Sequence, residues 1–276
     1  MIPTFICTIY NLQDFDKLIK SQLKNANLDF SKTNSIYSNG VSDSGLSAQL
    51  AQCIYLENLS INLHKSNLED IDIFDLGNSL EKCQNLINLN IKLDTNYISD
   101  KGVSYLGNSL SKCQNLKTLN IDLWTNQIQD QGLLSLGQGI QKCKNLRSLE
   151  LTQCENSFKN KGVIDLLISL KSCCSLKNLT LDLSLNSFAE QFGYDLGTAL
   201  ECLHHITSLQ LGLSNSLSQA FEDEDCSALC NILAKCQNIK VLYIELANNN
   251  CWYVTKEQLE MKLKKMKNLI KLDLNF

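Results

Sequence analysis

Cysteine is the residue type whose number and spacing first suggest chemistry, because a thiol can be a nucleophile, a metal ligand or half of a disulfide. The chain has 13 cysteines in 276 residues, and five of them, Cys53, Cys83, Cys113, Cys143 and Cys173, recur thirty residues apart. A thiol at one fixed place of a repeat is typical of a small buried hydrophobe. Neighbouring helices lie about 8–10 Å apart, whereas a disulfide needs Cα atoms within about 7 Å. Reduced structural thiols, without a ladder of disulfides, are therefore predicted.

Two smaller groups suggest metal binding or catalysis. Cys202 lies close to His204 and His205, and Cys226 and Cys230 are four residues apart. Structural zinc requires four ligands, and no further Cys or His pair completes either set. No serine or cysteine is placed with a histidine and an acid in the manner of a catalytic triad, and no Gly-x-x-x-x-Gly-Lys-Ser/Thr phosphate loop occurs. The sequence predicts no enzyme, no metal site and no cofactor.

The overall composition narrows the class of partner. The chain is 44% hydrophobic and 20% charged, with a formal net charge of −4. A protein that neutralises nucleic-acid phosphates usually carries a basic excess, so nucleic acid is not expected as a partner. No run of about 18 apolar residues could span a membrane, and the first fifteen residues lack the basic start of a signal peptide. We therefore expect a soluble cytoplasmic protein in a reducing compartment.

The cysteine interval belongs to a longer internal repeat. "GNSLEKCQNLINLNI" at 77–91 returns as "GNSLSKCQNLKTLNI" at 107–121 and as "GQGIQKCKNLRSLEL" at 137–151. After Cys173 the frame continues through Leu203, then Cys236 after thirty-three residues and Met266 after a further thirty. Self-similarity at intervals of 20–50 residues is the signature of a stacked repeat architecture. Eight copies, here called rungs, share one frame.

Two hydrophobic periods alternate within each rung. After the cysteine position, apolar residues alternate with polar ones, as at Leu89, Ile91 and Leu93, which predicts a strand with one buried face. Before it, apolar residues recur at helical spacing, as at Val103, Leu106 and Leu110. In five rungs a small residue stands six positions before the cysteine position, at Gly77, Gly107, Gly137, Gly197 and Cys230. We interpret that position as a site of close helix packing.

Asparagine connects strand to helix at Asn96, Asn126 and Asn186, and its side chain stabilises tight turns by bonding to nearby backbone groups. The resulting pattern, L-x-x-L-x-I-x-L-x-x-N-x-I-x-D-x-G at 86–102 and 116–132, resembles the leucine-rich repeat family. The resemblance implies an α/β solenoid, curved, with a parallel inner sheet and outer helices. The rung length and true helix are similar to the ribonuclease-inhibitor subtype, and Cys-x-x-Leu with Asp-x-Gly is similar to the cysteine-containing subtype of F-box proteins. The composition is similar to leucine-rich repeat arrays of ciliates.

The expected domain organisation is one cap and one solenoid. Residues 1–24 are predicted to form an N-terminal cap, because an end rung would otherwise expose its apolar side, and residues 25–276 are predicted to form about eight to nine rungs of about 30 residues. The asparagine comes two residues later than in the family's motif, after an extra apolar residue such as Leu93, which predicts one more strand pair. No helix follows the final strand, "NLIKLDLNF". A frayed end, a partner that covers this edge and a longer chain remain alternatives.

The residues that vary between rungs carry the prediction of function. The variable residues that alternate with the core positions of each strand should line a polar, mildly acidic concave face. Trp124 should lie at its rim, and Tyr243 occupies a corresponding position in a later strand. Exposed Trp and Tyr are frequent interface anchors. Trp252 is a further candidate, with the alternative that it fills the core of the last rungs. The predicted partner-binding residues are Trp124, Asp122, Glu150, Lys92, Asp94, Asp182, Tyr243, Glu245 and Trp252.

The predicted function is a non-catalytic scaffold for protein partners, because a stack of repeats offers a pre-formed surface. A structural or assembly subunit of a larger complex, including a cytoskeletal or ciliary one, is the first hypothesis. A substrate-recognition subunit of a ubiquitin ligase is the second, although residues 1–24 are short for an F-box. A GTPase-activating or other enzyme-regulating repeat protein is the third. Arg147 is the only arginine and stands at a strand start, which disfavours a catalytic finger.

Overall fold

The computed structural model describes residues 7–9, 15, 23–31, 45–186, 188–214, 221–249, 251 and 256–275. Within these residues one parallel sheet of ten strands runs in sequence order. The strands are β1 (Cys7–Ile9), β2 (Asn25–Asp29), β3 (Asn58–Asn62), β4 (Asn88–Lys92), β5 (Thr118–Asp122), β6 (Ser148–Thr152), β7 (Asn178–Asp182), β8 (Ser208–Gly212), β9 (Val241–Glu245) and β10 (Lys271–Asn275). The helices are α3 (Leu46–Leu50), α4 (Asp70–Leu80), α5 (Asp100–Leu110), α6 (Asp130–Ile140), α7 (Asn160–Leu170), α8 (Phe192–Glu201), α9 (Asp223–Leu233) and α10 (Lys256–Leu263).

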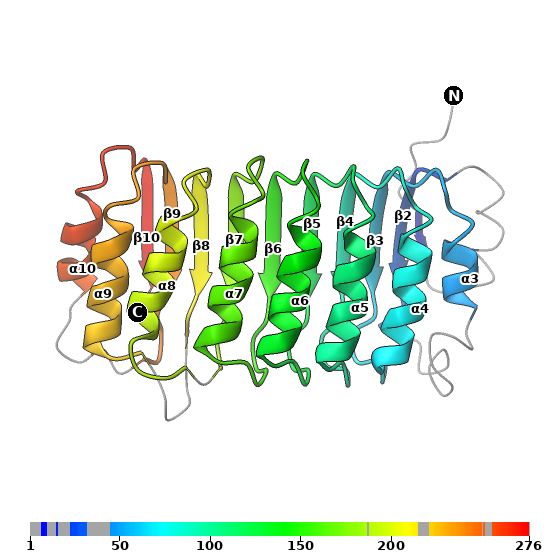
Figure 1. Cartoon of the computed structure of the whole chain (residues 1–276), viewed down its shortest axis with the longest axis horizontal. Helices are drawn as coiled ribbons and strands as arrows, with labels where there is room; N and C mark the ends of the chain where they lie inside the picture. Colours follow the sequence, from blue (N-terminus) through cyan, green and yellow to red (C-terminus); the bar gives the residue numbers. More distant parts are fainter. Residues whose placement is uncertain are drawn as a thin grey trace.

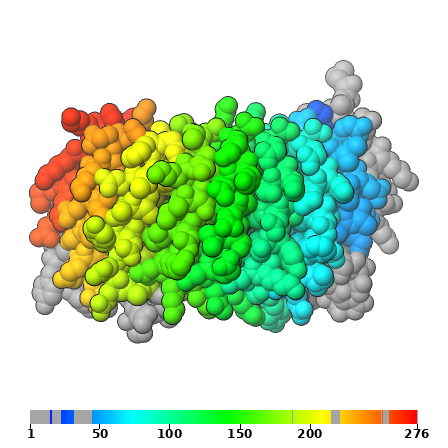
Figure 2. Space-filling model, in the orientation of Figure 1, coloured from blue at the N-terminus to red at the C-terminus, as the bar shows by residue number. Residues whose placement is uncertain are grey.

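The helices stack side by side over one face of the sheet (Figure 1), in the same order as the strands. In the same view the space-filling surface forms bands that follow the sequence from one end of the molecule to the other (Figure 2). The sheet is open, with β1 at one edge and β10 at the other. This is the α/β leucine-rich repeat solenoid that the repeat predicts. No helix among the described residues is long and apolar enough to cross a membrane.

The core repeats from strand to strand because the register is constant. Leu89 pairs with Leu119 and Ile91 pairs with Ile121, and these four side chains are buried. The predicted alternation of buried and more exposed residues is confirmed in the strands: in β4 the three polar residues are half-buried or exposed between buried Leu89 and Ile91. Hydrophobic area removed from water in this way is the main favourable term in folding.

The extra apolar residue after each strand continues the backbone hydrogen bonding between neighbouring rungs beyond the end of the strand. Strand β4 ends at Lys92, yet the Leu93 amide donates to the Asp122 carbonyl and the Thr95 amide donates to the Trp124 carbonyl, each at 2.8 Å. Thr95 has a φ of 58°, so the backbone turns away directly afterwards. The predicted strand pair is therefore two additional hydrogen bonds between rungs, followed by a left-handed turn.

The asparagine turn joins neighbouring rungs as well as stabilising its own. The Asn96 Oδ1 accepts hydrogen bonds from the amides of Ser66 (2.9 Å) and Leu68 (3.0 Å) in the preceding rung, and its Nδ2 donates to the Leu93 carbonyl at 2.7 Å. Asn126 and Asn186 make equivalent bonds, as predicted. The structure adds two members that the prediction omitted, Asn156 and Asn249.

Close helix packing is confirmed at the small-residue position. A Cβ built on Gly107 of α5 would lie 2.7 Å from the Ser135 carbonyl oxygen of α6, closer than real Cβ atoms approach. Leu167 stands at the equivalent position of α7, where the sequence pattern has no small residue. The stack of helices is thus tightest where glycine removes the side chain.

The ladder cysteines are buried free thiols in the structure. Cys83, Cys113 and Cys143 are almost inaccessible to solvent, and burial raises the pKa of each thiol from 9.0 to about 12. A protonated, buried thiol is a poor nucleophile. The interpretation of these cysteines as core residues agrees with this environment.

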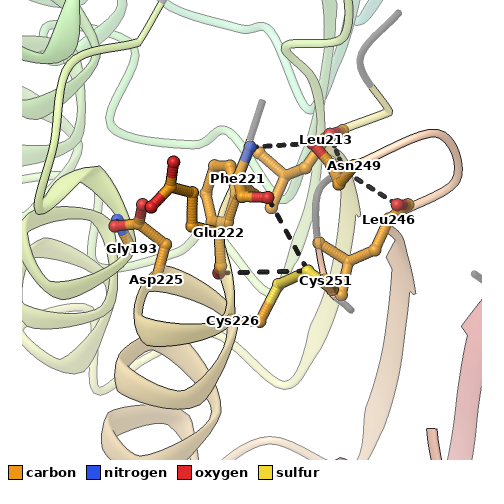
Figure 3. Close-up of a disulfide and its surroundings, with 9 residues drawn as sticks. All are labelled: Gly193, Leu213, Phe221, Glu222, Asp225, Cys226, Leu246, Asn249 and Cys251. Carbon is orange, nitrogen blue, oxygen red and sulfur yellow. Dashed lines mark hydrogen bonds between the residues drawn. A yellow bond between two sulfur atoms is a disulfide. The ribbon is translucent and has the colours of Figure 1, made fainter. Parts of the chain in front are cut away.

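The prediction that the thiols are all reduced is wrong for one pair. Cys226, in the first turn of α9, forms a disulfide with Cys251, which follows β9 (Figure 3). The argument from spacing applied to cysteines thirty residues apart. Cys226 and Cys251 are 25 residues apart and lie in neighbouring rungs, and the spacing argument did not cover them. The fold brings the start of α9 and the turn after β9 together. The disulfide weakens the cysteine argument for a reducing compartment.

The start of the chain is described only in part. Strand β1 falls within the segment 1–24, predicted as a cap, and pairs in parallel with β2, while Phe15 is buried. The sheet therefore extends into the predicted cap. The boundary between cap and solenoid stays a prediction.

Candidate functional site on the open face of the sheet

The candidate site is the face of the sheet that no described helix covers, here called the open face. Alternate residues of each strand point to it, and the constant register stacks them in lanes across the strands. The middle lane consists of Asn27, Ser60, Asn90, Asn120, Glu150, Thr180, Gln210, Tyr243 and Asp273. The end lane consists of Asp29, Asn62, Lys92, Asp122, Thr152, Asp182, Gly212, Glu245 and Asn275.

The end lane brings three predicted residues together. Lys92 and Asp122 are cross-strand neighbours on β4 and β5, and Thr152 separates Asp122 from Asp182. Burial raises the pKa of the Asp122 carboxyl, and the Asp94 and Asp182 carboxylates raise it further. The Trp124 backbone amide and the Lys92 ammonium act in the opposite direction. The end lane is thus a partly desolvated acidic strip with one lysine beside it.

Trp124 lies immediately beyond Asp122, at the rim of the open face. Its backbone amide donates to the Asp122 Oδ1 at 3.2 Å, which couples the turn to the end lane. The residue is 41% exposed, as predicted for a rim position. A half-exposed indole can bury the rest of its large apolar area against a partner. Its binding role remains a prediction.

Asp94 is a correction to the predicted exposed set. It is only 7% exposed, and its Oδ2 is hydrogen-bonded to the Nδ1 of His64 from the preceding rung. The sequence places Asp94 in the same lane as Trp124, but the histidine covers its carboxylate. Cys154, which the same lane predicts to be on the concave face, is also buried. Asp94 is therefore largely hidden on the open face, and the effect that it has there is to raise the pKa of Asp122.

Tyr243 and Glu245 form a second group on β9. The Tyr243 hydroxyl donates to the Glu245 Oε2 at 2.5 Å, and the Asn275 Nδ2 donates to the same oxygen at 2.7 Å. Burial acts to raise the pKa of Glu245, but these hydrogen bonds outweigh it and lower the pKa. Tyr243 is three strands from Glu150 along the middle lane, or roughly 14 Å at the usual strand spacing. Trp252 lies outside the described residues.

The first strands carry a neutral hollow that the sequence reasoning did not identify as a site. Its volume is about 530 Å³, and its lining from β2 to β5 contains neither charged nor aromatic residues. The Asn88 Nδ2 donates to the Asn58 Oδ1, the Asn58 Nδ2 donates to the Asn25 Oδ1, and the Asn90 Nδ2 donates to the Ser60 Oγ at 3.1 Å. The repeated asparagine at the strand start was the available signal. The open face therefore has two parts. The neutral hollow over β2 to β5 is here called the amide half, and the part with Asp122, Glu150 and Asp182 on β5 to β7 is called the acidic half.

The helical side also has an aromatic cluster, in which Phe74 is exposed and Tyr105 is half-buried. Phe74 of α4 and Tyr105 of α5 make an edge-to-face contact with ring centres 5.0 Å apart, and the Lys101 ammonium is 5.9 Å from the Tyr105 ring. The sequence analysis did not identify this cluster. Among the described residues, no group of three or more His, Cys, Asp or Glu side chains is arranged to hold a metal ion.

Comparison with known proteins gives likeness in fold only. No protein-family model matches the chain, and no curated protein matches it. An internalin from Listeria monocytogenes is 17% identical, with a TM-score of 0.46, over 94% of this chain and 69% of the internalin chain. Internalin C2 from the same organism is 17% identical, with a TM-score of 0.41, over 83% of this chain and 84% of its own. The leucine-rich repeat assignment rests on the strand order, register and helix placement of this chain itself.

Proposed function

We propose that this protein is a non-catalytic scaffold that binds a protein partner through the acidic half of the open face. The observation that carries the proposal is that Trp124 is 41% exposed and that its backbone amide donates to the partly buried carboxylate of Asp122. Tryptophan is one of the residue types that most often anchor an interface hot spot. The surface is built on consecutive rungs of one sheet, so little ordering is needed when it binds.

The chemistry of the acidic half favours a partner with a lysine or arginine segment. Asp122, Glu150 and Asp182 lie on three consecutive strands, and Asp94 adds a fourth negative charge behind them. A cation that approaches Asp122 would replace water at a carboxylate whose hydration is already reduced by burial. Opposite charges of this kind contribute to specificity and association rate more than to affinity. Lys92 limits the acidic strip on the β4 side.

Within this class we favour a structural or assembly subunit of a larger complex. The outer edge of β10 has no partner strand among the described residues, and Ile270 beside it is 79% exposed. Such an edge offers backbone hydrogen-bonding groups to a further strand, whether from this protein or from a partner. No contact in the described part of the chain favours the ubiquitin-ligase or GTPase-regulating alternatives.

The test compares two single substitutions, one of a tryptophan and one of a tyrosine. A partner is first recovered by affinity purification with the wild-type chain. Trp124→Ala removes the proposed anchor, and Tyr194→Ala removes an exposed tyrosine from α8 on the helical side. We expect that a partner recovered with the wild-type chain binds Trp124→Ala at least about 30-fold more weakly in calorimetric titration, since a hot-spot truncation costs about 2 kcal/mol or more. Tyr194→Ala should leave the affinity unchanged. Equal affinity for the wild type and Trp124→Ala would place the interface elsewhere.

A second measurement tests the proposed charge of the partner. Asp122→Asn keeps the shape of the side chain and removes its charge. The association rate should fall for this variant, and its dependence on salt should become weaker than that of the wild type. An association rate that is insensitive to salt in the wild type would refute a basic partner while leaving the Trp124 anchor untouched.

A further inference from the structure

The cysteine ladder bridges neighbouring rungs along most of the solenoid. At four successive steps the thiol of one rung lies within hydrogen-bond distance of a carbonyl oxygen in the preceding rung: Cys83 with Leu50 (3.6 Å), Cys113 with Leu80 (3.7 Å), Cys143 with Leu110 (3.2 Å) and Cys173 with Ile140 (3.7 Å). At the next position Leu203 replaces the cysteine. At the one after that, the Cys236 thiol bonds to the Ile232 carbonyl of its own helix at 3.9 Å. Between the α8–β8 turn and the α9–β9 turn, a bond within one rung thus takes the place of the thiol bond to the preceding rung.

A cavity opens where this bridge is replaced. Its volume is about 260 Å³, and it lies between the α8–β8 turn and the α9–β9 turn. The residues that line it are Leu200, Glu201, Leu203, His204, Ile206, Leu209, Lys235, Cys236, Gln237, Asn238 and Ile239. The Asn238 Nδ2 donates to the His204 carbonyl and holds the two turns together at the cavity.

The cavity has an apolar floor and a polar rim. Leu203, Ile206, Leu209 and Ile239 are buried members of the hydrophobic core, so the floor is the core itself. The rim carries one acidic residue, Glu201, with one lysine and one histidine, and this mixture selects neither an anion nor a cation. Protein interiors are otherwise packed without voids larger than a water molecule. An apolar space of this size that reaches the surface is suited to an apolar guest.

We infer that this cavity is a binding site for a neutral, ring-sized, apolar small molecule. An apolar cavity of about 150 Å³ in another protein stays dry and binds benzene, so about 260 Å³ accommodates a larger ring such as a fused bicycle. The guest would bury its ring against Leu203 and Ile239 and leave a polar edge at Glu201 and Lys235. The site lies at the turns that precede β8 and β9, so it is independent of the interface proposed for the acidic half of the open face.

Indole is a suitable probe, because it is neutral and bicyclic and has one polar N–H. Nuclear magnetic resonance of methyl-labelled full-length protein should show saturable shifts of the Leu203, Ile206, Leu209 and Ile239 methyl groups. The dissociation constant should be on the order of a millimolar, as is usual for so small a ligand. The Leu116 and Leu119 methyl groups, at equivalent positions in an earlier rung, should not shift. Nuclear Overhauser contacts from indole to the Leu203 and Ile239 methyl groups would locate the ring without any substitution.

A matched pair of variants tests the location. Cys236→Phe places a ring inside the cavity and should weaken indole binding at least about tenfold. Cys174→Phe adds the same ring at an exposed cysteine of an earlier rung that does not line the cavity, and should leave the affinity unchanged. Thermal unfolding establishes that both variants are folded. If Cys236→Phe does not fold, the Overhauser contacts in the wild type decide. Absence of saturable shifts, shifts spread over unrelated rungs, or full affinity in folded Cys236→Phe would each overturn the inference.

Discussion

The Oδ1 of Asp130 in α6 accepts a hydrogen bond from the amide of Gly162 in α7 at 3.0 Å, and a Cβ at Gly162 would lie only 2.6 Å from that same oxygen. The carboxylate also accepts from the Lys159 amide at 2.7 Å, so it satisfies two free donors at the start of the next helix. The negative charge is favourable at this helix end. The repeated aspartate and glycine positions thus act together across rungs, because the glycine of one rung leaves the space that the aspartate of the preceding rung occupies.

The first prediction concerns this aspartate and glycine. Gly162→Ala should lower the free energy of unfolding by about 1–3 kcal/mol, because the new methyl group must displace Asp130 or its backbone. Lys161→Ala is the matched control in the same helical turn, since it removes only a surface ion pair with Asp165, and such pairs contribute little to stability. Urea unfolding monitored by circular dichroism measures both. Equal losses for the two variants would contradict the role of the glycine.

The second prediction concerns Gln153, whose slot is occupied by Leu93, Leu123 and Leu183 in other rungs. Gln153 is 0% exposed, and neither polar atom of its side chain has a hydrogen-bond partner among the described protein atoms. A buried unsatisfied polar group costs about 1–3 kcal/mol. Gln153→Leu should therefore raise the free energy of unfolding by a similar amount in urea unfolding. The reciprocal Leu123→Gln should lower it, and a neutral or destabilising Gln153→Leu would show that the amide is satisfied.

The third prediction follows from the raised pKa of the ladder thiols. Burial raises the pKa of Cys83, Cys113 and Cys143 from 9.0 to about 12 in the folded chain. The unfolded chain therefore loses these protons first, so the stabilisation is complete below about pH 9 and declines as the pH rises towards 12. The free energy of unfolding should fall by about 2 kcal/mol per thiol between pH 9 and pH 11.

The control for this pH dependence is a chain with one ladder thiol fewer. Cys113→Ala should show a shallower decline over the same pH range, because the lysines and tyrosines titrate equally in both chains. Urea unfolding at intervals of half a pH unit gives the two slopes. Identical slopes would indicate that Cys113 already ionises near its ordinary pKa in the folded protein.

The fourth prediction concerns the disulfide between Cys226 and Cys251. Cross-linking residues 25 apart removes conformational entropy from the unfolded chain, worth about 3 kcal/mol. Reduction of the wild type should lower the unfolding midpoint, whereas Cys251→Ser should start lower and be insensitive to the reductant. Alkylation of the unfolded, unreduced chain followed by mass spectrometry should leave Cys226 unmodified. Alkylated Cys226 in that sample would contradict the disulfide.

Much of the fold follows from local patterns. The alternation at Leu89 and Ile91, the helical spacing at Val103 and Leu106, and the asparagine at position 96 each identify an element or a turn, and the interval of thirty residues implies that the elements stack. These patterns are properties of short stretches of chain, because which residues face the core depends on the period of the backbone.

The candidate site follows from the sequence less completely. The lane pattern placed Trp124 at an exposed rim correctly. It failed for Asp94, because a carboxylate in the right lane is hidden when His64 from the rung before it folds over it. It also missed the Asn58–Asn88 ladder and the cavity beside Cys236, which are relationships between side chains thirty or more residues apart.

The sequence by itself determined the repeat, the alternation of strand and helix, the buried positions and the parallel stacking, because hydrophobic periodicity acts along the chain. Only the tertiary structure decided which side chains meet across rungs: Cys226 with Cys251, Asp130 with Gly162, His64 with Asp94. Such contacts depend on the register between neighbouring rungs and on the direction of each side chain. The hydrophobic period determines neither of them, because it is the same whether a polar residue bonds to its neighbour or faces water.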